Sequence, residues 1–187
     1  MKKLTESNVY SGKWISVKES VYENSAGDLV RWESVVRQNN GGGVVIIPRL
    51  VPSQRFVLVK QFKPATNGDV LGFPAGQHPN SDRDIIRELK RATGYTGSIV
   101  QKSPFMKSGS GIVNDFGRVV YMHIDETHQI NRVSQQKQAA SGDREVFLVN
   151  QEDIKDLILN SLKNGVSVGA NLWYLFVGSE WIRLDKK

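Results

Sequence analysis

The fold is decided by two stretches of the sequence: Leu71-Gly72-Phe73-Pro74-Ala75-Gly76 and Arg87-Glu88-Leu89-Lys90-Arg91-Ala92-Thr93-Gly94-Tyr95. The first is a short strand candidate that Pro74 closes. The second is the end of a predicted helix. Ser81 and Asp84 have capping-box spacing, which marks the helix start, and Gly94 is a natural stop after Thr93. The two stretches therefore predict a strand, a loop and a helix in succession.

Upstream of this unit the sequence predicts a β-hairpin. Residues 14–22 and 29–37 are rich in strand-forming residues, and residues 23–28 supply turn chemistry between them. The run of asparagine and glycine at 39–43 then breaks the pattern, as a flexible boundary or a plain loop would. We therefore expect residues 1–40 to form an N-terminal β-hairpin region and residues 41–187 to form the main domain.

The main domain combines many strands with few helices. Further strand candidates are residues 44–47, 56–62, 98–105, 118–124 and 145–149, and helices are expected at 152–163 and 170–177. The polar segment 125–144 is long for a plain loop, which indicates a functional or mobile element. This order of elements predicts an α+β or layered α/β/α domain.

Composition narrows the function. Among 187 residues there is no cysteine, which excludes a disulfide framework, a cysteine zinc site and a cysteine nucleophile. The formal net charge of +6 fits an anionic ligand such as a phosphate compound or nucleic acid, and fits equally well a basic surface that keeps the protein soluble. No segment has the length of a membrane span or the core of a signal peptide. We expect a soluble cytoplasmic protein.

The stretch around Glu88 resembles the Nudix box, in which helix glutamates hold divalent cations against a diphosphate. Other stretches resemble landmarks of the ADP-ribose or ADP-sugar pyrophosphatase branch of that family, in the same order along the chain: residues 12–14, 31–35, 57–64, 73–76 and 142–145. The resemblance implies a Nudix-type α/β/α sandwich with a mixed β-sheet.

The resemblance also implies roles for individual residues. Trp14 and Trp32 would sandwich the adenine of a nucleotide sugar such as ADP-ribose across a homodimer, since indole faces stack well on purines. Glu145 would be the general base. The remaining substrate-binding positions would be Glu33, Lys60, Lys63, Ala75 and Gly76. Without the family match, these residues read as ordinary strand tryptophans, solvated lysines and a surface carboxylate.

The chain departs from the family where the metal would bind. Gly72, Arg91 and Ala92 stand at positions where the family has glutamates, and only Glu88 remains of the helix ligands. Arg91 is three residues from Glu88, so the two side chains are expected to form an ion pair. Asp84 shares a helix face with Glu88 and is a weak metal candidate, although its spacing from Ser81 fits a helix cap better.

These residues lead to one main hypothesis and two alternatives. The main hypothesis is a Nudix-fold protein that binds an adenine nucleotide sugar diphosphate, with Arg91 against the phosphates and hydrolysis impaired or lost. The first alternative is an active hydrolase that uses Mg²⁺ in an unconventional site with Glu145 as base. The second is a regulatory or nucleic-acid-binding protein, which the scattered basic residues do not favour. Neither a membrane nor a nucleic acid is an expected partner.

Overall fold

The computed structural model describes residues 1–38, 42–77, 81–132 and 144–178. The chain divides into two compact units. The first combines residues 1–43 with residues 104–118, and the second combines residues 44–103 with residues 119–187. Each unit is therefore built from two separate stretches of sequence.

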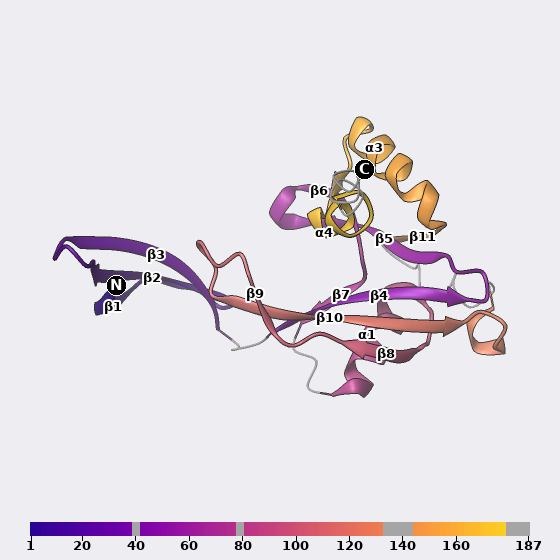
Figure 1. Cartoon of the computed structure of the whole chain (residues 1–187), viewed down its shortest axis with the longest axis horizontal. Coiled ribbons are helices and arrows are strands. Elements are labelled where there is room, and N and C mark those ends of the chain that lie inside the picture. The colour runs from indigo at the N-terminus through magenta and orange to yellow at the C-terminus, as the bar shows by residue number, and fades with distance from the viewer. Residues whose placement is uncertain (39–41, 78–80, 133–143, 179–187) are drawn as a thin grey trace, which may run out of the picture. The chain divides into compact units, whose positions relative to one another are not determined.

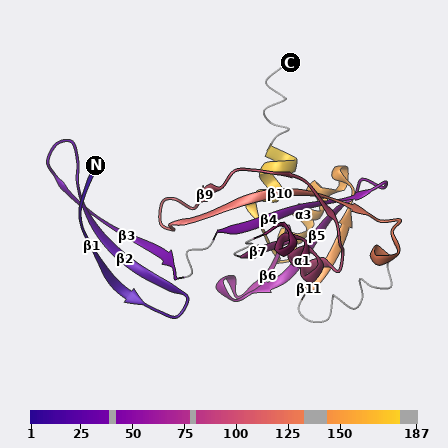
Figure 2. The ribbon, with the colours of Figure 1, turned by 90° about the horizontal axis from the view of Figure 1, so that it is seen from below.

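The first unit contains an antiparallel sheet of the strands β1 (Lys2–Ser11), β2 (Ile15–Glu23) and β3 (Leu29–Arg37), which are drawn in indigo to violet in Figure 2. Strand β2 lies between the other two. The predicted hairpin is confirmed as β2 and β3, which pair from Ile15 with Arg37 to Glu23 with Leu29. In the turn, the side-chain oxygen of Asn24 accepts hydrogen bonds from the backbone N–H groups of Ala26 and Asp28.

Strand β1 was not expected from the sequence. All its residues are exposed, so it lacks the alternation of apolar and polar residues that identifies a half-buried strand. It is held by its pairing with β2, which extends from Lys2 opposite Glu23 to Ser11 opposite Ser16. The predicted two-stranded region is thus a three-stranded sheet.

The later stretch of the first unit lies against β3. Strand β9 (Met106–Ser108) pairs with the start of β10 (Asp115–Asp125). The indole Nε1 of Trp32 donates to the carbonyl oxygen of Gly111 at 2.9 Å. Arg37 Nε donates to Asp115 Oδ2 at 2.8 Å, which adds an ion pair to the same contact.

The second unit is built on a mixed sheet, as predicted. Strands follow one another in the order β12-β6-β5-β4-β10-β8, with β11 also paired to β5 and β7 to β4. Strand β12 runs parallel to β6, whereas β5 is antiparallel to both β6 and β11. The bounds of these strands are β4 Gly43–Val51, β5 Phe56–Lys63, β6 Gly68–Gly72, β7 Ala75–Gln77, β8 Ser98–Lys102, β11 Arg144–Val149 and β12 Ser167–Val168.

Helix α1 (Asp82–Thr93) has the ends that the sequence predicts. The Ser81 side chain accepts a hydrogen bond from the backbone N–H of Asp84. Gly94 follows the helix with φ of 80°, a left-handed conformation that glycine adopts without steric cost, and its N–H donates to Lys90 O.

The remaining helices follow β11. Helix α3 (Ile154–Lys163) continues from the short 3₁₀ turn η3 (Gln151–Asp153), and α4 (Ala170–Leu172) leads into a π-helical turn, η4 (Trp173–Gly178). Two more 3₁₀ turns are η1 (Pro64–Thr66) and η2 (Gln129–Asn131). No helix in the described part of the chain is long and apolar enough to cross a membrane.

Strand β5 separates two hydrophobic cores. Val57 contributes to the core beneath α1, whereas its neighbours Phe56 and Leu58 contribute to the core beneath α3 and α4. Successive side chains of a strand point to opposite faces, so β5 serves both cores. Figure 1 shows α1 and α3 on opposite sides of strands β4 and β10. This layering of helix, sheet and helix is the predicted α+β sandwich.

Candidate functional site

The centre of the predicted site is an ion pair on helix α1. Arg91 Nε donates to Glu88 Oε2 at 2.9 Å, and Arg91 Nη2 donates to Glu88 Oε1 at 2.5 Å. Both carboxylate oxygens therefore accept from one guanidinium, which is the strong two-bond geometry of this pair. The Glu88 side chain is only 18% exposed, whereas that of Arg91 is 55% exposed. The ion pair that the sequence predicts is thus present.

The Pro-Ala-Gly loop packs directly on Glu88. A Cβ atom placed on Gly76 would lie 2.5 Å from Cγ and 2.8 Å from Cδ of Glu88, closer than real atoms approach. Glycine at 76 therefore allows the loop to reach the carboxylate. A Cβ atom on Gly72 would meet nothing within 4 Å, so the position where the Nudix resemblance predicts a glutamate has room for a side chain.

Two further cations gather near this ion pair. Arg144, the first residue of β11, donates from Nη1 to the carbonyl oxygen of Arg91 at 3.2 Å. Lys63 ends β5. Burial lowers the pKa of the Lys63 ammonium below its usual value, and the positive charges of Arg144 and Arg91 lower that pKa further. The surroundings of Glu88 are consequently rich in positive charge.

Lys60 and Glu145 lie on the other face of the sheet. They are directly opposite each other in the β5–β11 register, and 2.5 Å separates Lys60 Nζ from Glu145 Oε2. The Lys60 ammonium also lies 5.7 Å from the ring centre of Phe147, which packs on the core beneath α3. The hydrogen bond to Glu145 raises the pKa of Lys60. The predicted general base is therefore paired with Lys60, on the face opposite α1.

The remaining metal candidate, Asp84, is engaged at the start of α1. It accepts hydrogen bonds from the Ser81 hydroxyl at 2.9 Å and from Arg87 Nη2 at 2.6 Å. Nudix hydrolases generally use divalent cations such as Mg²⁺, which require several oxygen ligands. Among the described residues, no three aspartate, glutamate, histidine or cysteine side chains are grouped to hold a metal ion. The side chains around Glu88 do not fit a resident Mg²⁺.

The predicted adenine-binding residues belong to the first unit. Trp14 is 65% exposed, with the Lys13 ammonium 4.9 Å from its ring centre, and Trp32 is 53% exposed. Trp32 lines a pocket of about 940 Å³ between the three-stranded sheet and residues 107–114, together with Tyr22 and Lys107. Glu33 is adjacent to Trp32 in β3 and opposite Glu19 in the register, so its side chain lies on the other face of this sheet.

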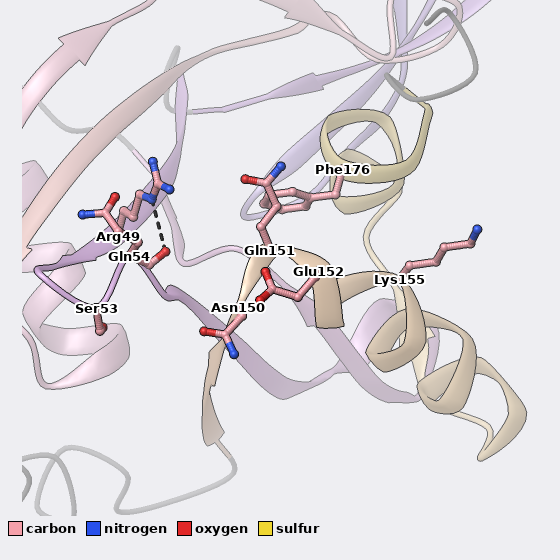
Figure 3. A pocket seen from close by; sticks show the side chains of 8 residues that line it. All are labelled: Arg49, Ser53, Gln54, Asn150, Gln151, Glu152, Lys155 and Phe176. Atoms are coloured by element: carbon pink, nitrogen blue, oxygen red, sulfur yellow. Dashed lines mark hydrogen bonds between the residues drawn. The ribbon is translucent and has the colours of Figure 1, made fainter. Parts of the chain in front are cut away.

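A second pocket lies in the second unit, away from the predicted residues. It has a volume of about 520 Å³ and is lined by residues of the β4–β5 turn and by the start of α3 (Figure 3). Arg49 donates from Nε to Gln54 O at 3.2 Å on one side of it, and Lys155 lies on the other. Of the predicted site, Ala75 is exposed in β7 and does not line this pocket.

Comparison with known proteins finds relatives that share one kind of name. The chain is 32% identical over 124 residues to the ADP-ribose pyrophosphatase of Saccharomyces cerevisiae, which covers 60% of this chain and 54% of that protein. It is 30% identical over 131 residues to the ADP-sugar pyrophosphatase of Mus musculus, covering 65% and 60%. A Caenorhabditis elegans protein named as a nudix hydrolase is 27% identical over 184 residues, covering 92% and 82%. The chain is similar to Nudix hydrolases of the ADP-ribose and ADP-sugar pyrophosphatase type.

Two further comparisons concern the fold and the extent of the similarity. The crystal structure of an ADP compounds hydrolase matches with a TM-score of 0.65 over 99% of this chain and 96% of that one, at 17% identity, which shows the shared Nudix fold. No protein-family model matches the chain. This chain spans 54% of the yeast relative and 60% of the mouse relative.

The sequence did not single out Arg144, whose side chain the structure places against the carbonyl oxygen of Arg91. Gly142 and Asp143 of the same motif lie outside the described residues, as does most of the polar segment 125–144. The alternation of side chains along a strand could have shown which of the predicted residues share a face of the sheet. Residues 144 and 145 must point to opposite faces, as must Lys60 and Lys63. Only tertiary pairing shows which face belongs to α1.

Proposed function

We propose that this Nudix protein binds an adenine nucleotide sugar diphosphate such as ADP-ribose, and that it hydrolyses the diphosphate poorly or not at all. The ligand class comes from the relatives, whose names are ADP-ribose pyrophosphatase and ADP-sugar pyrophosphatase. The loss of hydrolysis rests on one observation, the two-bond ion pair between Glu88 and Arg91.

The physical argument concerns competition for one carboxylate. A hard divalent cation needs several oxygen ligands. Of the helix glutamates that the Nudix resemblance implies as metal ligands, only Glu88 is present. Both oxygens of Glu88 already accept hydrogen bonds from Arg91, which is permanently charged. A cation at this position would have to displace the guanidinium and would then face it at close range. Metal-dependent hydrolysis is therefore disfavoured.

Adenine recognition would come from the first unit. Both Trp14 and Trp32 expose more than half of their surface, and an exposed indole face can stack on a purine with about 1–3 kcal/mol per base. Pairing of the two tryptophans across a homodimer is part of the same proposal. Sedimentation analysis at several protein concentrations tests the dimer directly, since a monomer at all concentrations would contradict it.

The deciding experiment is a calorimetric titration with ADP-ribose in EDTA, followed by an assay for AMP release with Mg²⁺ or Mn²⁺. We expect heat of binding without metal and negligible AMP. Trp32→Ala should weaken the binding, while Trp173→Ala serves as a tryptophan control outside the first unit. Absence of heat with ADP-ribose and with other nucleotide sugars would overturn the proposal. Rapid AMP release would instead establish an active hydrolase with an unconventional site.

A further inference from the structure

Three cations lie on the α1 side of the sheet: Arg91, which bonds Glu88, Arg144, which bonds the Arg91 carbonyl, and Lys63, two residues along β5 from the partner of Arg144. Arg91, Arg144 and Lys63 carry the positive charges, and Glu88 carries the negative charge. The charges of Arg91 and Arg144 act on the Lys63 ammonium and lower its pKa, in addition to the larger effect of burial. The cluster therefore has more positive charge than its own carboxylate neutralises.

The three cations are positioned by separate elements that fix them in place. Arg91 lies in the last turn of α1, Arg144 begins β11, and Lys63 ends β5. Arg144 uses one of its nitrogen donors for the Arg91 carbonyl, which is one of the carbonyls that the helix end leaves without an intrahelical partner. A guanidinium has five N–H donors, and within the described residues the Arg144 side chain uses one of them in this way, which leaves donors for a ligand.

Like charges held this close favour an anion between them. Their mutual repulsion is relieved when a bound anion enters. Burial is the main cause of the lowered pKa of Lys63, and the charges of Arg144 and Arg91 add to it. A phosphate group suits the cluster better than a single carboxylate. The diphosphate of a nucleotide sugar carries two negative charges in total, and its oxygens accept paired hydrogen bonds from guanidinium groups in the geometry that Arg provides.

We propose that Arg144, Arg91 and Lys63 form a metal-independent binding site for the phosphate groups of the ligand, and that Glu88 is the internal counterion which the phosphate displaces from Arg91. This inference rests on the proposed function and deepens it, because it assigns the residues that take the place of the metal. It adds Arg144 to the site. It also gives Glu88 a role opposite to that of a metal ligand, since the carboxylate competes with the ligand instead of helping to hold it.

The test is a calorimetric titration of the full chain with inorganic pyrophosphate in EDTA. Arg144→Gln is expected to weaken binding about tenfold and Lys63→Gln about fivefold, since hydrogen bonds to charged groups contribute most strongly. Glu88→Gln is expected to strengthen binding severalfold. The matched control is Arg87→Gln: Arg87 is on the same helix and has the same three-residue spacing to its acid, Asp84, but its side chain is 74% exposed. It should change binding less than twofold.

Two further measurements distinguish failure of the phosphate site from failure of the proposed function and from unfolding of a variant. Arg144 caps α1, so each variant is melted by circular dichroism, and Lys63→Gln carries the test if Arg144→Gln is unfolded. ADP-ribose is titrated into the same variants. If ADP-ribose binds and none of these substitutions changes pyrophosphate binding, the phosphate site is wrong and the proposed function stands. If pyrophosphate binding responds as expected but ADP-ribose gives no heat, the nucleotide-sugar function fails. Weaker binding by Glu88→Gln contradicts the counterion role.

Discussion

Lys60 and Glu145 form an ion pair across β5 and β11, with 2.5 Å between Nζ and Oε2, on the face of the sheet that α1 does not cover. Glu88 lies on the helix that covers the opposite face. The strand register shows no shift from Val149 to Arg144, so alternation assigns Lys60 and Glu145 to the side of α3. A catalytic role for Glu145 would need the ligand to reach around the strand ends.

The first prediction concerns the contribution of this ion pair to the free energy of unfolding. Lys60→Gln and Glu145→Gln should each lower the free energy of unfolding by less than about 1 kcal/mol, because cross-strand pairs at the surface are weak and screened by salt. Urea unfolding of the two single variants and the double variant gives the coupling energy, which should shrink at high salt. A coupling energy of several kcal/mol would contradict the description of this contact as a weak surface ion pair.

The second prediction concerns the loop on Glu88. Gly76→Ala should destabilise the protein by about 1–2 kcal/mol, because its methyl group would overlap Cγ of Glu88 and force that side chain to move. Gly72→Ala is the matched control, since its methyl group would enter open space and should change stability by less than about 0.5 kcal/mol. Denaturant unfolding measures both. Adding Glu88→Ala to Gly76→Ala should remove most of the penalty, and a full penalty in the double variant would contradict the contact.

The third prediction concerns restored glutamates. The triple variant Gly72→Glu, Arg91→Glu and Ala92→Glu should acquire Mg²⁺-dependent release of AMP from ADP-ribose if the remaining pocket is sound. Position 72 has room, but Ala92 is only 5% exposed, so a glutamate there is costly without a cation. We therefore expect the melting temperature of the triple variant to rise when Mg²⁺ or Mn²⁺ is added, as ligand linkage requires. A melting temperature indifferent to both metals would mean that no cation site had formed.

The fourth prediction concerns alkaline stability. Burial raises the pKa of the Tyr95 hydroxyl to about 12, whereas an unfolded tyrosine titrates near 10. The unfolded state therefore loses this proton first as the pH rises. The resulting stabilisation is complete below about pH 10 and is lost as the pH passes through 12. Urea unfolding at about pH 9 and pH 11 should show a loss that is smaller in Tyr95→Phe, by on the order of 1–2 kcal/mol. An equal loss in both proteins would show that Tyr95 does not contribute.

The helix at the centre of the site was predictable because its signals are local. Ser81 and Gly94 are read directly from the sequence, and both occupy the capping positions they predict. Gly76 was also predicted as part of the site, but its contact with Glu88 depends on how the loop folds back onto α1. The local sequence pattern predicts that Gly76 belongs to the site, but it does not predict that Gly76 contacts Glu88.

Strand β1 and Arg144 were missed for a common physical reason. Both owe their place to a partner distant in the sequence. Strand β1 has no buried face and is held by pairing with β2, while Arg144 reaches α1 because β11 pairs with β5. Propensity and periodicity report on burial and on neighbours along the chain. They contain little information on which side of a sheet a polar side chain will lie.

The contact between Trp32 and Gly111 also constrains how the protein folds during its synthesis. The two residues are 79 positions apart, and Arg37 and Asp115 are 78 apart, yet these bonds join the two stretches of the first unit. Contacts of such long sequence separation slow folding, because a large loop must close before they form. During synthesis the three N-terminal strands emerge early, but the segment that closes their unit follows only after most of the second unit's sheet and α1. An exposed, unfinished strand edge in that interval is a site for chaperones, and for aggregation when chaperones are scarce.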